Sequence, residues 1–340
     1  MSNLKKKFPG IRISTKTKIL LIVLCVIALY FVPYVIRGQY WGRIINQAIV
    51  NMLVVLGLNL LSGYLGLLNV GASGMVAVGA YTAALLATRL GVPMIVGIVC
   101  AIIVGVILGN VLGITCLRLN GIYLVLMTSA FAEIVRTLLI NMEPLTGGAI
   151  GVKQIPAFNV FGHKLTDTVS QYYLFLTILI VCVLIVWRIT HSKWGRVFLA
   201  IKDNYESVET CGINVASMKM KAFTAAAILA CVAGALYAGM AGYITPTDFT
   251  GDKGNQYVLM MMVGGWSNVF GSLLGAVLVT VLPDVLKFLG YSYWLVFYLI
   301  VFVIAIIMPG GLVSIFTKGK TFNFDSIVES FRWMRRKKKK

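Results

Sequence analysis

Nine apolar segments, each long enough to form a membrane-crossing helix, run through the 340-residue chain. They lie at residues 19–36, 44–61, 67–88, 92–117, 121–140, 172–189, 219–243, 257–282 and 291–308. In hydrocarbon the backbone N–H and C=O groups find no water, so only helices and closed barrels satisfy them. The residue-by-residue alternation of barrel strands is absent. The segments therefore predict an all-α polytopic membrane protein with eight to ten transmembrane helices.

Basic residues gather at the two ends of the chain and set its predicted orientation. Half of all Lys and Arg lie in residues 1–18 or after Thr317. Lys and Arg that flank membrane helices stay on the cytoplasmic side, so we expect both termini to be cytoplasmic. Topology and anionic lipid headgroups thus explain the net charge of +19, and no nucleic-acid partner is predicted. The chain divides into a basic N-terminal tail (1–18), a transmembrane domain (19–316) and a basic C-terminal tail (317–340).

An odd number of segments is incompatible with two cytoplasmic ends, so we expect one segment to be broken or re-entrant. Glycine is concentrated at residues 63–81 and 264–275, which makes these two stretches the candidates. Irregular backbone at membrane depth is tolerated where it is buried in protein or lines a cavity, and broken helices form substrate paths in transporters. Close helix packing through small residues is the alternative explanation for these glycines. Eight or ten crossings satisfy the parity.

The sequence carries no arrangement typical of an enzyme or of a metal site. The six cysteines form no CxxC pair, and the two histidines lie in polar loops without other ligands at metal spacing. The stretch "SIFTKGKT" ends like a phosphate-binding loop, but Ser314 stands where that motif requires glycine. We therefore expect a non-catalytic chain without a metal or cofactor.

Glu133 and Arg136 stand inside the segment 121–140 at a spacing of three, which places them on one helical face. Ionisable groups at membrane depth are costly and are candidates for a substrate path. A mutually satisfied structural pair is the other interpretation. No chain of carboxylates or histidines crosses the membrane segments, which argues against an ion-coupled transporter.

The loop 190–218 is rich in charge, and counting from the N-terminus places it on the cytoplasmic side, opposite the external loop 141–171. Apolar residues recur there at spacings of four, four and three, at Val197, Ile201, Tyr205 and Val208. This pattern predicts one amphipathic helix over 196–211 that ends at Gly212. Acidic residues on its polar face disfavour anionic lipid, so docking of a soluble partner is the sharper hypothesis.

Several segments, taken in order, resemble the permease subunits of bacterial ABC importers for branched-chain amino acids. The resemblance covers the chain from about Ile45 to Pro309. It rests on "LNLLSGYLGLLNVGASGMVAVGAYTAALL", "LRLNGIYLVLMTSAFAEIVR", "LTGGAIGV", "GRVFLAIKDNYESVETCGINV", "AGALYAGMAGYITP" and "GGWSNVFGSLLGAVL". No single motif is specific, but their order and spacing together are.

The resemblance implies a multi-pass subunit of the bacterial cytoplasmic membrane that forms a path with a second permease subunit in the bilayer. Two ATP-binding subunits would drive it, and an extracytoplasmic substrate-binding protein would deliver leucine, isoleucine or valine. ATPase coupling would then involve Arg196, Ile201, Asp203, Glu206, Glu209, Gly212 and Ile213. The candidates for the translocation path are Asn59, Gly63, Asn69, Gly71, Glu133 and Arg136. Contact with the binding protein would involve Thr146, Gly147 and Gly148.

The chain departs from the family pattern at two places. Leu67, Asn69 and Ala72 stand where the family often has Gln, Ser and His, and Thr210-Cys211 replaces two alanines of the coupling loop. If the first set lines the path, urea, short amides or nucleosides are alternative substrates. An ion-coupled secondary transporter and a membrane-embedded scaffold or enzyme remain as other classes, which a neighbouring gene for an ATPase would argue against.

Overall fold

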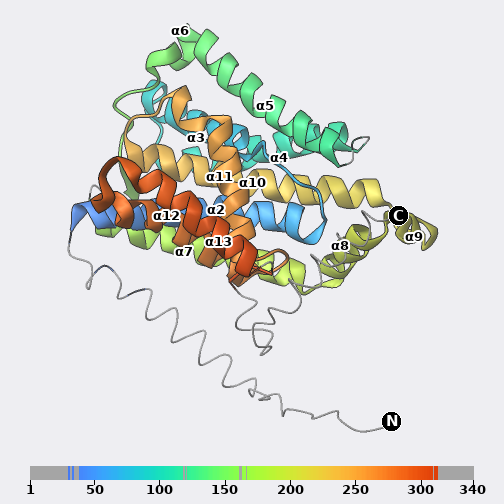
Figure 1. The fold of residues 1–340 in the computed structure, drawn as a ribbon. Helices are drawn as coiled ribbons and strands as arrows, with labels where there is room; N and C mark the ends of the chain where they lie inside the picture. Colours follow the sequence, from blue (N-terminus) through green and yellow to red (C-terminus); the bar gives the residue numbers. More distant parts are fainter. Residues whose placement is uncertain are drawn as a thin grey trace.

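The computed structural model describes residues 30, 33, 38–117, 119, 121–160, 163–165, 167–308 and 310–312. The two basic tails lie outside the described residues, as does nearly all of the predicted first span at 19–36. Within the described residues the chain is almost wholly helical, which confirms the all-α class (Figure 1). The single small sheet of this part is a two-stranded hairpin.

The helices correspond closely to the apolar segments, as expected when hydropathy reflects burial in lipid or protein. In chain order the elements are α2 (Gln39–Leu58), the π-helix η1 (Asn59–Tyr64), α3 (Ala72–Arg89), α4 (Met94–Cys116), α5 (Ile122–Asn141), α6 (Glu143–Thr146), η2 (Gly148–Ile150), β1 (Phe158–Val160), β2 (His163–Leu165), α7 (Thr168–Thr190), α8 (Lys193–Asp203), α9 (Tyr205–Thr210), α10 (Val215–Ala241), η3 (Pro246–Phe249), α11 (Gly251–Gly264), α12 (Val269–Leu286), η4 (Lys287–Ser292) and α13 (Tyr293–Ile307).

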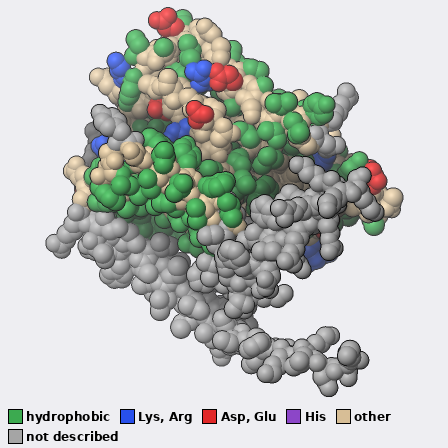
Figure 2. All heavy atoms as spheres, viewed as in Figure 1, with side chains coloured by type: hydrophobic (Ala, Val, Ile, Leu, Met, Phe, Trp, Pro, Cys, Tyr) green, Lys and Arg blue, Asp and Glu red, His purple; other side chains and the backbone are tan. Residues whose placement is uncertain are grey.

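Six of the described helices are long and apolar enough to cross a membrane: α2 with η1, α4, α5, α7, α10 and α12 with the start of η4. Figure 2 shows that the middle of one face is covered largely by hydrophobic side chains, while acidic side chains appear toward its top and right edge. Large apolar residues on α13, among them Leu295, Leu299 and Phe302, are exposed. Such a broad apolar surface fits contact with lipid or with another membrane subunit.

Helix α10 forms the centre of the bundle and packs against α4, α3 and α2. Small residues let these backbones approach closely. A Cβ on Gly234 would lie 2.8 Å from Ala80 N and still closer to Val76 O, and a Cβ on Gly79 would collide with the backbone of Cys231. In lipid, helices associate through such close packing because the surrounding hydrocarbon supplies little hydrophobic drive. Packing thus explains many of the glycines and alanines of α3 and α10.

Two ends of the bundle can be defined from contacts between elements. Asn46 Nδ2 near the start of α2 donates to Thr168 O at the start of α7 (3.1 Å), so these two helices run in the same direction. Helix α12 runs opposite to α2, because Asn51 lies against Thr280 and Asn59 against Ser272. Helices α8 and α9 lie at one end of the bundle, the α8–α9 end, at the right edge of Figure 1. The loop 141–167 forms the opposite end, the hairpin end.

Both glycine-rich stretches contain a break in helical structure, whereas the sequence predicted only one broken segment. The chain leaves η1 at Tyr64 and does not resume a helix until Ala72. The segment expected as one span at 257–282 is two helices, α11 and α12, which are joined by a turn at residues 265–268. This turn lies at the α8–α9 end, so α11 and α12 form a hairpin that enters the bundle and returns.

The described residues of the loop 141–167 are folded and packed onto the bundle. Strands β1 and β2 pair antiparallel, with Phe158 opposite Leu165. The side chain of Phe158 is fully buried, and a Cβ on Gly239 of α10 would collide with its ring. Val152 also pairs with Ile244 just after α10. The polar, turn-rich sequence predicted a loop here but not the hairpin, since the strand residues are too few to show a pattern.

Candidate functional site

The polar segment between α7 and α10 forms two helices, so the single helix expected over 196–211 is wrong. Helix α8 ends at Asp203, and α9 begins at Tyr205. Asn204 between them has extended backbone (φ −158°, ψ 105°), and its Oδ1 accepts a hydrogen bond from Ser207 N at 3.2 Å. An asparagine side chain that binds its own downstream backbone favours a helix start over a helix interior.

The break turns the apolar stripe of the segment. Of the predicted stripe, Ile201 and Val208 are buried, whereas Tyr205 is 46% exposed. Phe198, which was not part of the predicted stripe, is only 1% exposed. Gly212 ends the segment as expected, with φ +77° and its N–H donating to Glu209 O at 2.9 Å. This left-handed conformation suits glycine because it has no Cβ.

The outward side of α8 and α9 combines charged and large apolar side chains, and we call it the docking face. Its exposed members are Trp194, Arg196, Leu199, Asp203, Tyr205, Glu206 and Glu209. Among the predicted coupling residues, Gly212 is also exposed, Ile213 is half-buried and Ile201 is buried beneath the face. Lys221 Nζ lies 4.2 Å from the centre of the Trp194 ring. Aromatic and arginine side chains exposed together on a polar segment are typical of protein–protein contact.

Asn59 and Gly63 lie where the two helix breaks meet. Asn59 Nδ2 donates to Asn268 O (2.8 Å) and to Ser272 Oγ (3.2 Å), and Asn59 Oδ1 accepts from Ser267 N (3.1 Å). The buried amide therefore ties η1 to the turn between α11 and α12. A Cβ on Gly63 would collide with Asn59 Oδ1 and lie 2.8 Å from Ser267 N, so glycine is required for this approach.

Asn69 and Gly71 shape the break that precedes α3. Asn69 is fully buried, and its Oδ1 accepts from Gly71 N at 2.8 Å. A Cβ on Gly71 would collide with the backbone of Thr128 on α5, whose Oγ1 accepts from Val70 N (3.3 Å). Asn59, Gly63, Asn69 and Gly71 thus lie inside the subunit, where they fix the paths of the two interrupted helices.

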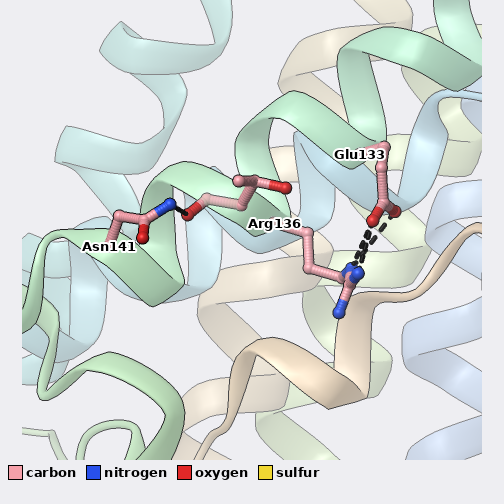
Figure 3. Close-up of polar contacts among 4 residues, drawn as sticks. Glu133, Arg136 and Asn141 are labelled. Carbon is pink, nitrogen blue, oxygen red and sulfur yellow. Dashed lines mark hydrogen bonds and ion pairs between the residues drawn. The ribbon is translucent and has the colours of Figure 1, made fainter.

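Glu133 and Arg136 lie on the surface of α5 and form the ion pair that their spacing predicts (Figure 3). Arg136 Nε is 3.0 Å from Glu133 Oε1 and 3.1 Å from Oε2, and Nη2 also contacts the carboxylate. The Glu133 side chain is 53% exposed and that of Arg136 is 28% exposed. Thr137 and Asn141 continue this polar stripe, and Asn141 Nδ2 donates to Thr137 O. The structure therefore brings a charged pair to an outer face of a helix long enough to span the membrane.

Thr146, Gly147 and Gly148 fold the start of the loop at the hairpin end. Thr146 is buried, and its Oγ1 donates to Leu139 O (2.6 Å) and accepts from Gly148 N (3.2 Å). Gly147 and Gly148 have φ of +76° and +61°, which only glycine adopts at low cost. The motif is a buried turn that holds exposed neighbours, including Leu145 and Ile150, at the surface.

A cavity of about 570 Å³ opens between α3 and α4 near the hairpin end. Apolar side chains such as Leu85, Ile103 and Val104 line it, with Arg89 at its edge. Arg89 is bound to the carbonyl oxygens of Pro144 and Leu145. None of the predicted path residues lines this cavity, so it is separate from the candidate path.

The family described as "Branched-chain amino acid transport system / permease component" matches residues 40–306 of the chain. The high-affinity branched-chain amino acid transport system permease protein LivM of Salmonella typhimurium is 32% identical over 303 residues, which cover 82% of this chain and 71% of the relative. LivM of Escherichia coli is 31% identical over the same shares of both chains.

More distant similarity extends to permeases with other names. The fructose import permease protein FrcC of Rhizobium meliloti is 28% identical over 42% of this chain and 42% of its own length. The matches to the two LivM proteins are therefore both longer and stronger. No solved structure matches the chain.

Proposed function

Since the chain belongs to the family of permease components of branched-chain amino acid transport systems, we propose that it forms the membrane path of an ABC importer for leucine, isoleucine and valine. The observation that carries the proposal is the match to the two LivM proteins, which spans 82% of this chain. The family also makes it a transport subunit of a larger assembly, so we assign ATP hydrolysis to partner subunits.

We place the α8–α9 end in the cytoplasm and the hairpin end outside. The predicted span 19–36 would start inside, and α2 would then cross from outside to the α8–α9 end. Helices α11 and α12 run from the outer end to the cytoplasmic end and back, so they leave the number of crossings even, and the chain returns to the cytoplasm after α13. The basic residues after Thr317 favour the same orientation.

The docking face is our candidate for binding one of the two ATP-binding subunits. It lies outside the long apolar helices, and its charges are interspersed in sign, from Arg196 to Glu209. Exposed Trp194, Leu199 and Tyr205 would become buried on binding, which supplies the apolar contact that a stable interface needs. Ile201 and Val208 hold α8 and α9 on the bundle, so force applied to the face would reach the membrane helices.

The Glu133–Arg136 pair is our candidate for the wall of the path or for the contact with the second permease subunit. A charged pair on the lipid face of a spanning helix is costly, so such groups turn toward a protein partner or an aqueous cavity. The pair is exposed in the single subunit, which leaves it free to face either one. Asn59, Gly63, Asn69 and Gly71 would contribute by shaping the interrupted helices behind the path.

The turn Thr146–Gly148 is our candidate for positioning the contact with the substrate-binding protein. Thr146 and Gly148 are themselves buried, so the contact would run through the exposed side chains that the turn carries, Leu145 and Ile150.

Uptake by proteoliposomes that contain the complete complex tests the proposal. With ATP inside and the binding protein outside, we expect uptake of labelled leucine, with competition by isoleucine and valine. Urea and nucleosides are the matched competitors, because the departures at Leu67, Asn69 and Ala72 leave such substrates as alternatives. Uptake that responds to urea or nucleosides but not to leucine would overturn the substrate assignment. Uptake that persists without ATP and follows an ion gradient would overturn the ABC mechanism.

A further inference from the structure

Lys202 of α8 reaches from the docking helix into the junction of the two broken membrane helices. Its Nζ donates to Gly63 O in η1 at 2.8 Å and to Ser267 Oγ in the α11–α12 turn at 3.2 Å. Ser267 Oγ in turn donates to Gly63 O at 2.5 Å. Three segments far apart in the sequence therefore share one small hydrogen-bonded cluster.

The backbone of the break after η1 is shaped to admit this side chain. Gly66 has φ +78°, and a Cβ there would lie 2.9 Å from Lys202 Cγ. Any other residue at Gly66 would displace the lysine stem or strain the backbone. The glycine thus gives the Lys202 stem a route across the break to the carbonyl of Gly63.

The charge of Lys202 suits its position at the end of α2 and η1. The last carbonyl groups of a helix lack helical partners and carry the negative end of its dipole. Gly63 O belongs to this last turn and accepts from Lys202 and Ser267. A cation supplied from α8 therefore stabilises the interrupted end of the membrane helix.

The turn that Lys202 contacts is itself held in a costly conformation. Ser267 has φ +58°, a left-handed value that is uncommon for a residue with a Cβ. Its N–H is bound to Asn59 Oδ1 and its hydroxyl to Gly63 O. Such backbone persists only when surrounding contacts impose it, so loss of the contacts would let the turn relax.

We propose that Lys202 is a positioning residue that couples movement of α8 to the two broken membrane helices through Gly63 and Ser267. The proposal rests on the proposed function in one respect, namely that the α8–α9 docking face receives the ATP-binding subunits. When α8 moves with its ATPase, the shared hydrogen bonds move η1 and the tip of the α11–α12 hairpin together. The conformational change that accompanies transport is then transmitted from α8 to the membrane helices through this cluster.

Three variants of this chain in the reconstituted complex test the coupling. Lys202→Met keeps the stem but removes the donor, Lys202→Arg restores a charged donor, and Lys193→Met removes a charge from the other end of the same helix. We expect Lys202→Met to raise the ATP hydrolysed per leucine imported by about tenfold. A hydrogen bond to a charged group can shift the equilibrium between two conformational states by a factor of this size. Lys202→Arg and Lys193→Met should stay within about twofold of the wild type. An unchanged ratio in Lys202→Met would overturn the proposal.

Hydrogen exchange of the purified complex provides a test that does not depend on the substrate. We expect the amides of residues 63–67 and 266–268 to exchange about tenfold faster in Lys202→Met than in the wild type. Ser267→Gly removes the hydroxyl and relieves the strain of the left-handed backbone. When it is combined with Lys202→Met, the exchange rates should differ little from those of Lys202→Met alone. Unchanged exchange at both segments would also overturn the proposal. Absence of leucine uptake by the wild type would instead count against the proposed function and leave the exchange test decisive for Lys202.

Discussion

At the residue scale, Asn59 uses both ends of its buried amide to bind two groups of the α11–α12 turn and the Ser272 hydroxyl of α12. If the amide were removed, the Ser267 N–H would lose its partner, whereas the Asn268 carbonyl would keep Ser272 N and the Ser272 hydroxyl would keep Val269 O. In hydrocarbon the alternative to a partner is an unsatisfied polar group, which makes such an amide costly to replace. Asn59 is therefore the residue on which the junction of the two breaks depends most.

Replacement of Asn59 by leucine tests this role. We expect Asn59→Leu to lower the free energy of unfolding by about 2 kcal/mol, because the Ser267 N–H loses its partner and the Asn268 carbonyl loses one of its two donors. Asn255→Leu on the exposed side of α11 is the matched control and should change stability by less than about 0.5 kcal/mol. Thermal unfolding of the purified subunit in detergent measures both. Equal melting temperatures for the two variants would show that the amide is dispensable.

The Glu133–Arg136 pair makes a second prediction at this scale. Glu133→Gln leaves the Arg136 charge without its partner on α5, and we expect leucine uptake to fall about tenfold. The exchange of both residues, Glu133→Arg with Arg136→Glu, restores a pair on the same face and should recover uptake to within about twofold. Recovery is expected because the two side chains act as one neutral unit. If the exchanged protein is as inactive as Glu133→Gln, the position of the carboxylate matters in its own right.

At the element scale, the packing of α3 on α10 depends on glycine rather than on large apolar side chains. A Cβ at Gly234 would come too close to the backbone of α3 at Val76 and Ala80. The two backbones therefore pack directly against each other at the centre of the bundle.

This packing predicts a steep response to one methyl group. Gly234→Ala should destabilise the subunit by more than about 2 kcal/mol, since a close-packed interface cannot absorb the added volume. Gly251→Ala is the matched control, because a Cβ there meets nothing within 4 Å. Gly251→Ala should raise the stability of the subunit by at most about 1 kcal/mol, because alanine has a higher helix propensity than glycine. The yield and melting temperature of the two variants measure this difference. A Gly234→Ala protein as stable as the control would refute the close approach of the α3 and α10 backbones.

The end of α9 makes a prediction about coupling. Proline at Gly212 cannot adopt φ +77° and removes the N–H that binds Glu209 O. We expect Gly212→Pro to raise the ATP hydrolysed per leucine imported by about fivefold, by displacing α9 relative to α10. Gly212→Asn should behave like the wild type, because asparagine tolerates the left-handed region. Simultaneous assays of hydrolysis and uptake give the ratio, and identical ratios for the two variants would contradict the role of this turn.

Part of this organisation follows from the sequence alone. Runs of apolar residues predict helices because hydrocarbon leaves the backbone no alternative, and both glycine clusters that were candidates for one broken segment coincide with breaks in helical structure. The break at Asn204 was missed because the spacing of Val197, Ile201 and Tyr205 continues a helical pattern across it. The end of α9 was found because Gly212 is a local signal.

Contacts between segments that are far apart in the sequence could not be predicted from local sequence patterns. Lys202 reads as one more charge on a polar face, and nothing near it in sequence indicates Gly63 or Ser267. Asn59 likewise reads as a polar residue inside a span until the α11–α12 turn is folded against it. The sequence proposed its site residues by residue type, and the structure divides them into surface and interior positions.

At the scale of the whole molecule, the two ends of the bundle present different surfaces. The α8–α9 end presents the docking face and carries Lys202 into the junction of the broken helices. The hairpin end is closed by β1–β2 and the Thr146 turn, which present exposed apolar residues such as Leu145 and Ile150. Between them lies α5, with its charged pair on an outer face. This division predicts that the ATPase and the binding protein contact opposite ends of the subunit.

Photo-cross-linking in the assembled complex measures this division most directly. A photoreactive residue is placed at Leu199 on the docking face and, as the matched control, at Ala149 in the exposed loop of the hairpin end. We predict that Leu199 captures the ATP-binding subunit and that Ala149 captures the substrate-binding protein but not the ATPase. Capture of the ATPase from Ala149, or its absence from Leu199 in a complex that hydrolyses ATP, would contradict the assignment of α8–α9 as the element through which this permease is driven.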